Sequence, residues 1–170
     1  MQSKTCKESY VVQTNVVLPN DLNNHDTLFG GQLMKMIDMI AGISAARHSR
    51  KKLVTASTDS IDFLAPIQKG DTVCLEAYVT WVGNSSIEVF VKIISENVLL
   101  SNRNMAATAF LTFVTIKENG VRSTVPRIIP ESEEEIFLYE TAEGRKKQRE
   151  IRRFHSRELA EKVSIKKLWE

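Results

Sequence analysis

The stretch GGQLMKMIDMIAGISAARH, residues 30–48, restricts the possible folds of this 170-residue chain more than any other feature. It predicts a helix whose apolar residues surround the axis instead of forming one stripe, and a helix of that kind is normally buried on all sides. Asp26 or Thr27 is a candidate N-cap, and a basic cluster over residues 47–52 suits the C-terminus of the helix. We therefore expect one long helix that other elements enclose.

Strand patterns supply the elements that would enclose this helix. One precedes it at 10–19, and four follow it at 53–66, 72–82, 85–95 and 105–116. The connections among the last four are short, with a hairpin signal at Gly83-Asn84, and short connections indicate antiparallel pairing. The sequence thus predicts an α+β fold, a curved antiparallel sheet wrapped around one central helix. A single sheet leaves edges open, so we expect at least a dimer.

The character of the chain changes near residue 120. Residues 8–120 contain every strong strand and helix pattern and form the predicted domain. Residues 121–170 begin with two chain-breaking prolines, Pro126 and Pro130, and continue with acidic residues followed by basic ones. We interpret them as an exposed helical extension, broken near Gly144, that serves in assembly or as a lid.

Composition excludes several classes of protein. A formal net charge of +2 is too small to indicate nucleic-acid or membrane binding. Cys6 and Cys74 form no disulfide framework, and with three histidines they show no zinc-site spacing. The N-terminus lacks the apolar core of a signal peptide, and the longest apolar run is too short for a bilayer. We expect a cytoplasmic protein without a metal, nucleic-acid partner or membrane anchor.

Asp38 is the residue in the predicted helix that most needs an explanation. A carboxylate removed from water costs several kcal/mol unless it is paired. Its neighbours three, four and seven residues away include Gly31, Ala41, Gly42 and Ala45, a strip of small residues that lets a ligand or second chain approach. Pairing with Lys35, or with backbone groups, would be a structural alternative. The strip favours an active-site base or nucleophile.

Gly30-Gly31 offers a second catalytic component. Backbone N–H groups at a helix N-terminus lack acceptors and lie at the positive end of the dipole, so they can bind an oxyanion during acyl transfer. Gly31 and Asp38 lie two helical turns apart, about 10 Å. An elongated substrate or a water could bridge them, or a partner subunit could supply one of them. The diglycine would otherwise be only a turn before a helix.

Four motifs in order resemble the hotdog-fold acyl-CoA thioesterases, in their bacterial single-domain branch: DTLFGGQLMKMIDMIAGISAARH (26–48), VTASTDSIDFLAPIQKGD (54–71), VGNSSIEV (82–89) and ATAFLTFV (107–114). The resemblance covers roughly residues 8–118. It implies hydrolysis of acyl-CoA to free acid and CoA in sites shared between subunits, with dimers assembled as a trimer of dimers. No cofactor is required, since CoA is part of the substrate.

The resemblance also implies roles for particular residues. The helix aspartate of the family's pattern, its catalytic carboxylate, maps onto Asp38. The related tandem-domain enzyme uses an asparagine three residues before the diglycine of its other half. That position here is Thr27, so Asn24 nearby is the candidate for the second catalytic residue, beside Gly31.

CoA binding requires groups for the phosphates. The turn residues Gly83, Asn84, Ser85 and Ser86 offer N–H groups and hydroxyls suited to an anion, although the segment could be an ordinary hairpin turn. Arg47 and Arg103 are the main cationic candidates, with further basic residues at 50–52; each could also be a solvated surface charge.

Three rival interpretations are weaker. Ser44 and His48 have the i, i+4 spacing of a nucleophile and base but no third orienting group. A hotdog hydratase or dehydratase would need a histidine beside Asp38, and none is present in the sequence. A non-catalytic acyl-CoA-binding module with a nucleic-acid-binding tail at 145–157 is opposed by the acidic residues that precede that tail.

Overall fold

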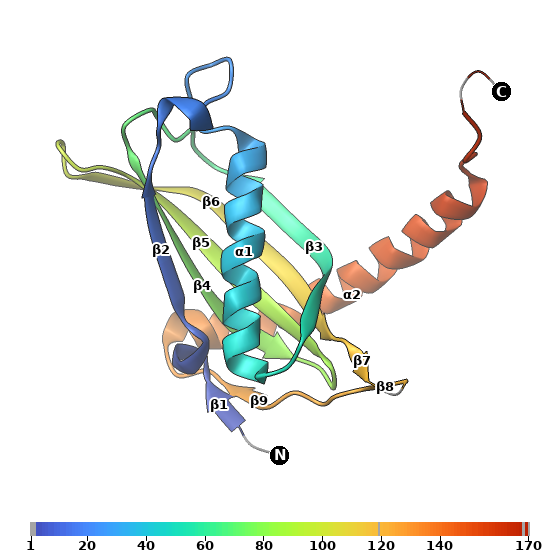
Figure 1. Cartoon of the computed structure of the whole chain (residues 1–170). Coiled ribbons are helices and arrows are strands. Elements are labelled where there is room, and N and C mark those ends of the chain that lie inside the picture. Colours follow the sequence, from blue (N-terminus) through green and yellow to red (C-terminus); the bar gives the residue numbers. More distant parts are fainter. Residues whose placement is uncertain (1–2, 119, 168, 170) are drawn as a thin grey trace.

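A five-stranded antiparallel sheet curves around one long helix, as the sequence predicts (Figure 1). The computed structural model describes residues 3–118, 120–167 and 169. The strand order is β2-β4-β5-β6-β3, with β3 at one edge. The bounds are Val11–Val16 for β2, Leu53–Phe63 for β3, Thr72–Val82 for β4, Ser86–Asn97 for β5 and Asn102–Thr115 for β6. The helix is α1, Gly30–Ser49.

Period-two burial places the core between the sheet and α1. Inner positions of β5 and β6 are closed to solvent, whereas their alternate residues face the other way. Ile37, Ile40 and Ala41 of α1 are completely buried against these strands. Burying such side chains stabilises the fold by roughly 1.5–3 kcal/mol for each large aliphatic residue.

The expectation that α1 is buried on all sides is wrong for the single chain. Met34, Met39 and Ile43 are exposed, Met39 to 52%, and Met39 and Ile43 border the groove between α1 and the edge strand β3. The reason is geometric, because one sheet covers only one side of a helix. The apolar pattern of α1 therefore includes a surface of the helix that this chain alone does not cover.

The predicted N-cap of α1 is also wrong. Phe29 occupies the N-cap position and makes no side-chain hydrogen bond to the helix. Asp26 adopts a left-handed backbone conformation (φ 58°) in the preceding loop, and the Thr27 side chain is bonded to Asn23. Neither residue is therefore free to cap the first turn.

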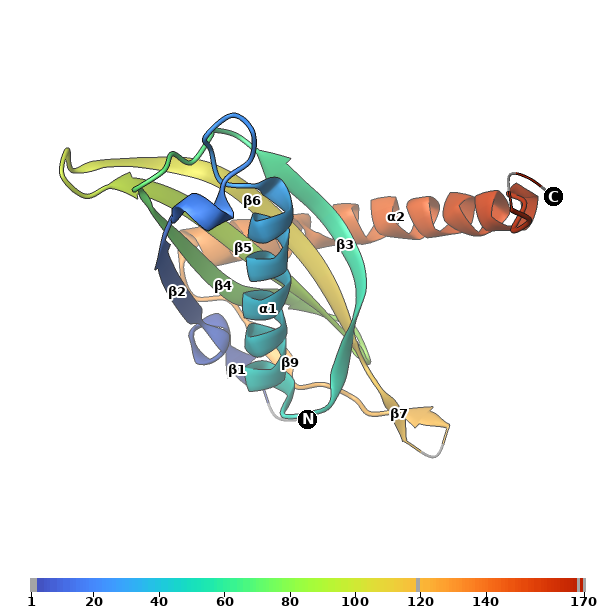
Figure 2. The ribbon, with the colours of Figure 1, turned by 45° about the horizontal axis from the view of Figure 1, so that its top comes forward.

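A second long helix, α2 (Glu133–Lys162), crosses the outer face of the sheet (Figures 1 and 2). It begins at a capping box between Ser132 and Glu135, and it runs through Gly144 without the expected break. One glycine costs a helix only about 1 kcal/mol, which packing of Leu138 and Ala142 against the sheet offsets. The extension is thus only partly exposed, because its first half is packed.

The remaining elements of the described chain are short. They are β1 (Ser3–Thr5), β7 (Lys117–Glu118), β8 (Val121–Arg122), β9 (Arg127–Ile129), and the 3₁₀ helices η1 (Cys6–Ser9) and η2 (Pro19–Asp21). β1 pairs in parallel with β9, and β7 pairs with β8. The β1–β9 pair holds the start of the extension against the beginning of the chain.

Candidate active site

Asp38 lies in the middle of α1 on its exposed side. The hydroxyl of Thr55, on the neighbouring strand β3, donates a hydrogen bond of 2.8 Å to the Asp38 carboxylate. Neither Lys35 nor any other cation among the described residues forms a salt bridge with it. A groove of about 580 Å³ surrounds it; its other lining residues are Met39, Gly42, Ile43, Ala46, Lys51, Lys52, Leu53, Val54, Thr55 and Phe113. Asp38 is thus a solvent-facing carboxylate beside an apolar groove, not a buried one.

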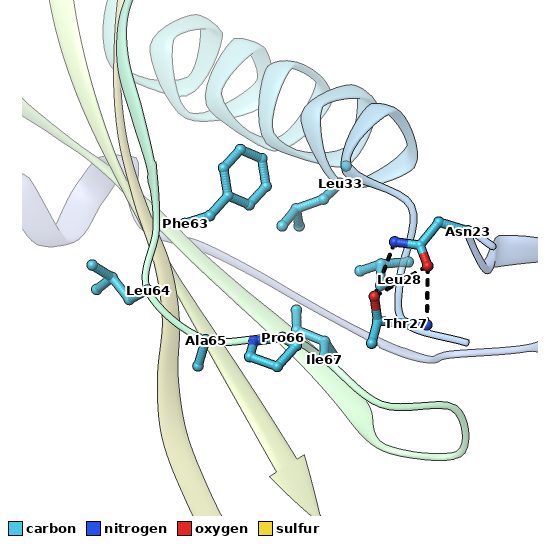
Figure 3. A pocket seen from close by; sticks show the side chains of 10 residues that line it. Asn23, Thr27, Leu28, Leu33, Phe63, Leu64, Ala65, Pro66 and Ile67 are labelled. Atoms are coloured by element: carbon cyan, nitrogen blue, oxygen red, sulfur yellow. Dashed lines mark hydrogen bonds between the residues drawn. The ribbon is translucent and has the colours of Figure 1, made fainter. Parts of the chain in front are cut away.

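A second cavity, of about 380 Å³, lies at the start of α1 (Figure 3). Its lining residues are Asn23, Thr27, Leu28, Gly30, Leu33, Phe63, Leu64, Ala65, Pro66 and Ile67. The N–H groups of Gln32 and Leu33 bond to the carbonyl of Phe29. In the described chain this leaves the N–H groups of Gly30 and Gly31 without an acceptor, at the positive end of the helix. Gly30 lines the cavity together with its apolar wall, whereas Gly31, the predicted donor, is not among the lining residues.

Asn23, not Asn24, lines this cavity. The Asn23 amide donates to the Thr27 hydroxyl at 2.9 Å (Figure 3). Its oxygen accepts the backbone N–H of His25 at 2.8 Å. Asn24 is exposed on the loop that these bonds close. Sequence reasoning missed Asn23 because the loop conformation decides which asparagine points inward. The sequence did contain one indication of this role for Asn23. Asn23 lies four residues before Thr27, a spacing that lets its side chain close a turn by hydrogen bonding.

The structure does not bring Asp38 and the helix start together within one chain. Asp38 does not line the helix-start cavity, and Gly31 lies two turns away, about 10 Å. β3 runs beside both, with Thr55 next to Asp38 and Phe63 next to Gly30. One chain therefore carries two partial sites along a common strand.

The candidate CoA-binding residues fall into separate places. The Gly83–Ser86 turn is closed by a hydrogen bond from the Gly83 N–H to the Ser86 carbonyl, and the Asn84 carbonyl accepts a hydrogen bond from the Val125 N–H. A cavity of about 330 Å³ adjoins Gly83 and Asn84 and also touches Arg127 and Tyr139. Ser85 is half-buried and receives a bond from Thr115 at its carbonyl.

The two candidate arginines are both engaged. Arg47 donates to the backbone carbonyl of Tyr10 at 2.6 Å. Arg103 pairs with Glu96 at 3.6 Å, where β5 and β6 meet at their far end. Since the Ser86 end of β5 is roughly 35 Å from that pair along the strand, Arg103 and the turn do not converge in one chain.

Ser44 and His48 form no catalytic pair. Both are completely buried, and neither the Ser44 hydroxyl nor Nδ1 of His48 has a hydrogen-bond partner among the described residues. Nε2 of His48 lies 2.8 Å from the carbonyl of Pro126. Burial lowers the pKa of His48, so its ring is neutral and ties the end of α1 to the chain before β9.

A second group of carboxylates lies on the outer face of the sheet, beneath α2. Arg149 forms salt bridges with Asp59 at 2.7 Å and with Glu88 at 3.6 Å, and Arg145 forms one with Glu88 at 2.7 Å. Burial acts to raise the pKa of Asp59, but hydrogen bonds from Ser57, Thr112 and Arg149 hold it below its usual range. Much of the basic run at 145–157 is thus neutralised within the chain, which weakens its interpretation as a nucleic-acid surface.

Across 3–118, 120–167 and 169, no cluster of three or more His, Cys, Asp or Glu side chains is placed to hold a metal ion. Over the same residues, no helix has the length and apolar character needed to cross a bilayer.

Comparison with known proteins gives this arrangement a family. Residues 25–101 match the family described as the thioesterase superfamily. An uncharacterized acyl-CoA thioester hydrolase, YkhA of Bacillus subtilis, is 56% identical over 99% of this chain and 98% of its own. The class defined by fold and site is therefore the hotdog thioesterases. Within it, the chain belongs to the acyl-CoA thioester hydrolases.

Solved structures agree. The acyl-CoA hydrolase of Staphylococcus aureus, in complex with butyryl-CoA, CoA and CoA disulfide, superposes with a TM-score of 0.88 at 42% identity, covering 94% of this chain and 97% of that one. The same enzyme has been solved with an aspartate, a threonine or an asparagine replaced by alanine. An apo-hexameric acyl-CoA thioesterase gives a TM-score of 0.86 at 42% identity, with coverages of 89% and 97%.

Proposed function

We propose that the Asp38 groove and the helix-start cavity together hydrolyse acyl-CoA thioesters to a free carboxylic acid and CoA. The observation that carries this proposal is the state of Asp38. It is exposed, has one neutral donor in Thr55 and borders an apolar groove. A carboxylate without a neutralising cation is available to accept a proton or to attack a carbonyl.

The chemistry follows from the groups present. The thioester carbonyl accepts the Gly31 N–H, which stabilises the negative charge that develops on its oxygen. Asp38 takes a proton from a water whose oxygen bonds to the carbonyl carbon. The C–S bond then breaks, and the proton passes to the leaving thiolate of CoA. In the alternative route, the Asp38 carboxylate attacks first and water cleaves the resulting mixed anhydride.

The spacing of the Staphylococcus aureus substitutions supports three of these residues. In that enzyme the replaced asparagine, aspartate and threonine are 15 and 17 positions apart. Asn23, Asp38 and Thr55 have the same separations here. We therefore favour Asn23 over Asn24 as the second catalytic residue, with Thr55 as the residue that positions Asp38.

The two partial sites would be completed by a second copy. The open edge of β3 and the exposed apolar side of α1 lie next to each other, and a copy that pairs along β3 would cover both. The Asp38 of one subunit would then face the helix start of the other. The hexameric relative supports further assembly, which we propose to be a trimer of such dimers.

For the CoA moiety, Lys51 and Lys52 join the candidates because they line the Asp38 groove. The Gly83–Ser86 turn and Arg47 remain proposed phosphate contacts. Arg103 contributes only if another subunit places its groove there. The reaction as written needs no metal or other cofactor. Two free thiols, Cys6 and Cys74, fit a cytoplasmic enzyme.

Thiol release from acyl-CoAs of increasing chain length tests the function. We expect turnover by the wild type and a loss of at least about 10²-fold in Asp38→Asn, the low end for removing a general base. Asn23→Ala should lose activity, whereas its matched control Asn24→Ala should retain it. Equal activity of wild type and Asp38→Asn would contradict the role of Asp38.

Isotope labelling separates the two chemical routes. In a single turnover in H₂¹⁸O, general-base catalysis puts the label directly into the product acid. Direct attack instead leaves label in the Asp38 carboxylate after water opens the anhydride at the aspartyl carbon.

A further inference from the structure

We propose that the second half of α2 is an arm that lies on the outer face of a second copy of this chain. The proposal rests on the pairing through β3 suggested above, and it assigns an occupant to a surface that this pairing alone does not explain. The surface is the stripe formed by Ser156 and Leu159 of α2 and by Val163, which directly follows the helix.

The first half of α2 uses one stripe to contact the sheet. Its residues alternate by four and three positions, the spacing of a single helix side, and they are Leu138, Ala142, Arg145, Arg149 and Arg152. Leu138 and Ala142 are buried, and the three arginines bond to groups that include Glu88 and Asp59. The stripe is therefore the side of α2 that rests on the outer face.

The chain's own sheet ends where this stripe reaches Arg152. Arg152 bonds to the Asp59 carboxylate and to the Ser57 hydroxyl, both on the edge strand β3. α2 continues to Lys162, so about 15 Å of helix projects past the edge. Both views of the ribbon show this projection beyond β3 (Figures 1 and 2).

Beyond Arg152 the stripe continues without interruption. The same spacing leads to Ser156 and Leu159, and then to Val163 at the residue after the helix; Leu159 is 62% exposed and Val163 57%. A shallow hollow of about 400 Å³ borders this stretch, lined by residues that include Ile151, Ser156 and Leu159. Because this uncharged stripe continues the side of α2 that packs on the sheet, we infer that it packs on another surface that continues the outer face of this sheet.

A second copy provides that surface. If its β3 pairs with this β3, the two sheets join into one, and the outer face continues under the projecting helix. The exposed apolar side chains of Met39, Ile43 and Val54, on α1 and β3 at the same edge, independently require a cover there. By two-fold symmetry each chain would place its arm on the other.

The charge on the opposite side of the arm fits this orientation. Arg153, Arg157 and Glu161 lie away from the stripe and are exposed. They would remain in water while Leu159 is covered. An arm turned the other way would have to bury these charges, at a cost of several kcal/mol.

Two matched substitutions test the arm. Leu159→Glu puts a charge into the stripe, whereas Phe154→Glu puts the same charge about 140° away on the same stretch of helix. The wild-type side chains are equally exposed, at 62% and 60%. The dissociation constant of the subunits is measured for each by sedimentation over a range of concentrations.

We expect Leu159→Glu to weaken association by at least about tenfold and Phe154→Glu by less than about twofold. Equal effects of the two substitutions, or no effect of either, would overturn the arm. A chain ending at Arg152 should associate as weakly as Leu159→Glu, and unchanged association of that shortened chain would also overturn it.

The same preparations keep this test separate from that of the proposed function. Thiol release by the wild type supports the hydrolase, whatever the variants show about association. A wild type that is monomeric at every concentration overturns the arm together with the β3 pairing. An active wild type whose association ignores Leu159 overturns the arm alone.

Discussion

The two faces of the sheet hold their carboxylates in opposite ways. On the inner side, Asp38 is exposed and has a single hydrogen bond from the neutral Thr55. On the outer side, the side chains of Asp59 and Glu88 are only 8% and 1% exposed beneath the arginines of α2. A buried carboxylate that is neutralised by a guanidinium holds elements together, whereas an exposed one without a cation can carry a reaction.

The contrast also explains why the chain tolerates a basic tail. Arg145 and Arg149 serve the carboxylates of the sheet, and the side chain of Arg145 also lies over the Phe110 ring at 4.2 Å. Lys146 lies over the ring of Trp81 at 5.5 Å. The first half of α2 is thus held by charge and aromatic contacts, while the inner face depends on aliphatic packing against α1.

Removing the central cation of the outer face should have the largest effect. Arg149→Met leaves Asp59 and Glu88 buried with fewer counter-charges, and breaking such a pair costs about 3–5 kcal/mol. We expect a loss of this size in the free energy of unfolding, measured in urea. The exposed Arg153 on the same helix is the control, and Arg153→Met should change stability by less than about 0.5 kcal/mol.

A loss below about 1 kcal/mol in Arg149→Met would show that the outer carboxylates do not depend on this cation. The buried carboxylates would then contribute no more to stability than the exposed Asp38 does, and the two faces would not differ in this respect.

Sequence predicted the parts of the fold that depend on local pattern. The four strands after α1 were found within a few residues, because alternation and turn residues specify each one separately. α1 was predicted correctly in its bounds but not in its surroundings. Its exposed apolar side chains suit a contact with another subunit, and the structure of one chain does not contain the surface that covers them.

The site was predictable only where it lies on one element. Asp38 and Gly31 share α1, so the helix pattern alone was enough to propose them as site residues, and they stay proposals. Arg149 and Asp59 are 90 residues apart in the chain, so no local pattern pairs them. The choice between Asn23 and Asn24 depends on a loop that turns at Asp26, whose φ is 58°. Loop conformation is the kind of information that periodicity does not contain.

On the inner face, the hydrogen bond to Asp38 offers the next test. Thr55→Val keeps the shape of the side chain but removes the donor, so the carboxylate loses its fixed orientation. We expect kcat for thiol release to fall roughly tenfold, as one hydrogen bond to a charged group is worth about 1.5–3 kcal/mol at most, while KM changes less than twofold.

Thr55→Ser restores the hydroxyl and should recover most of the lost kcat. A role in packing alone would be indicated if Ser and Val behaved alike, or if KM rose while kcat stayed constant. In that case Thr55 would belong to the groove wall and would not be a positioning residue.

Acid pH should reveal the smallest of these effects. Hydrogen bonds from Ser57, Thr112 and Arg149 overcome burial and hold the pKa of Asp59 below its ordinary value of 3.8. The folded state therefore binds this proton less readily than the unfolded chain does. The stabilisation is fully present above pH 3.8 and is lost as the pH falls through the lower folded value. Urea unfolding at pH 6, 4.5 and 3.5 measures the slope.

The pKa of Glu134 is also lowered, because hydrogen bonds from Tyr78 and Lys92 outweigh the effect of burial. The pH dependence of wild-type stability therefore contains contributions from both Asp59 and Glu134. The informative quantity is the difference between wild type and Asp59→Asn, which should shrink as the pH decreases. Asp62→Asn, an exposed carboxylate on the same strand, should run parallel to the wild type. A constant difference for Asp59→Asn at all three pH values would mean that its charge contributes nothing to holding α2, and that shape alone fixes the outer face.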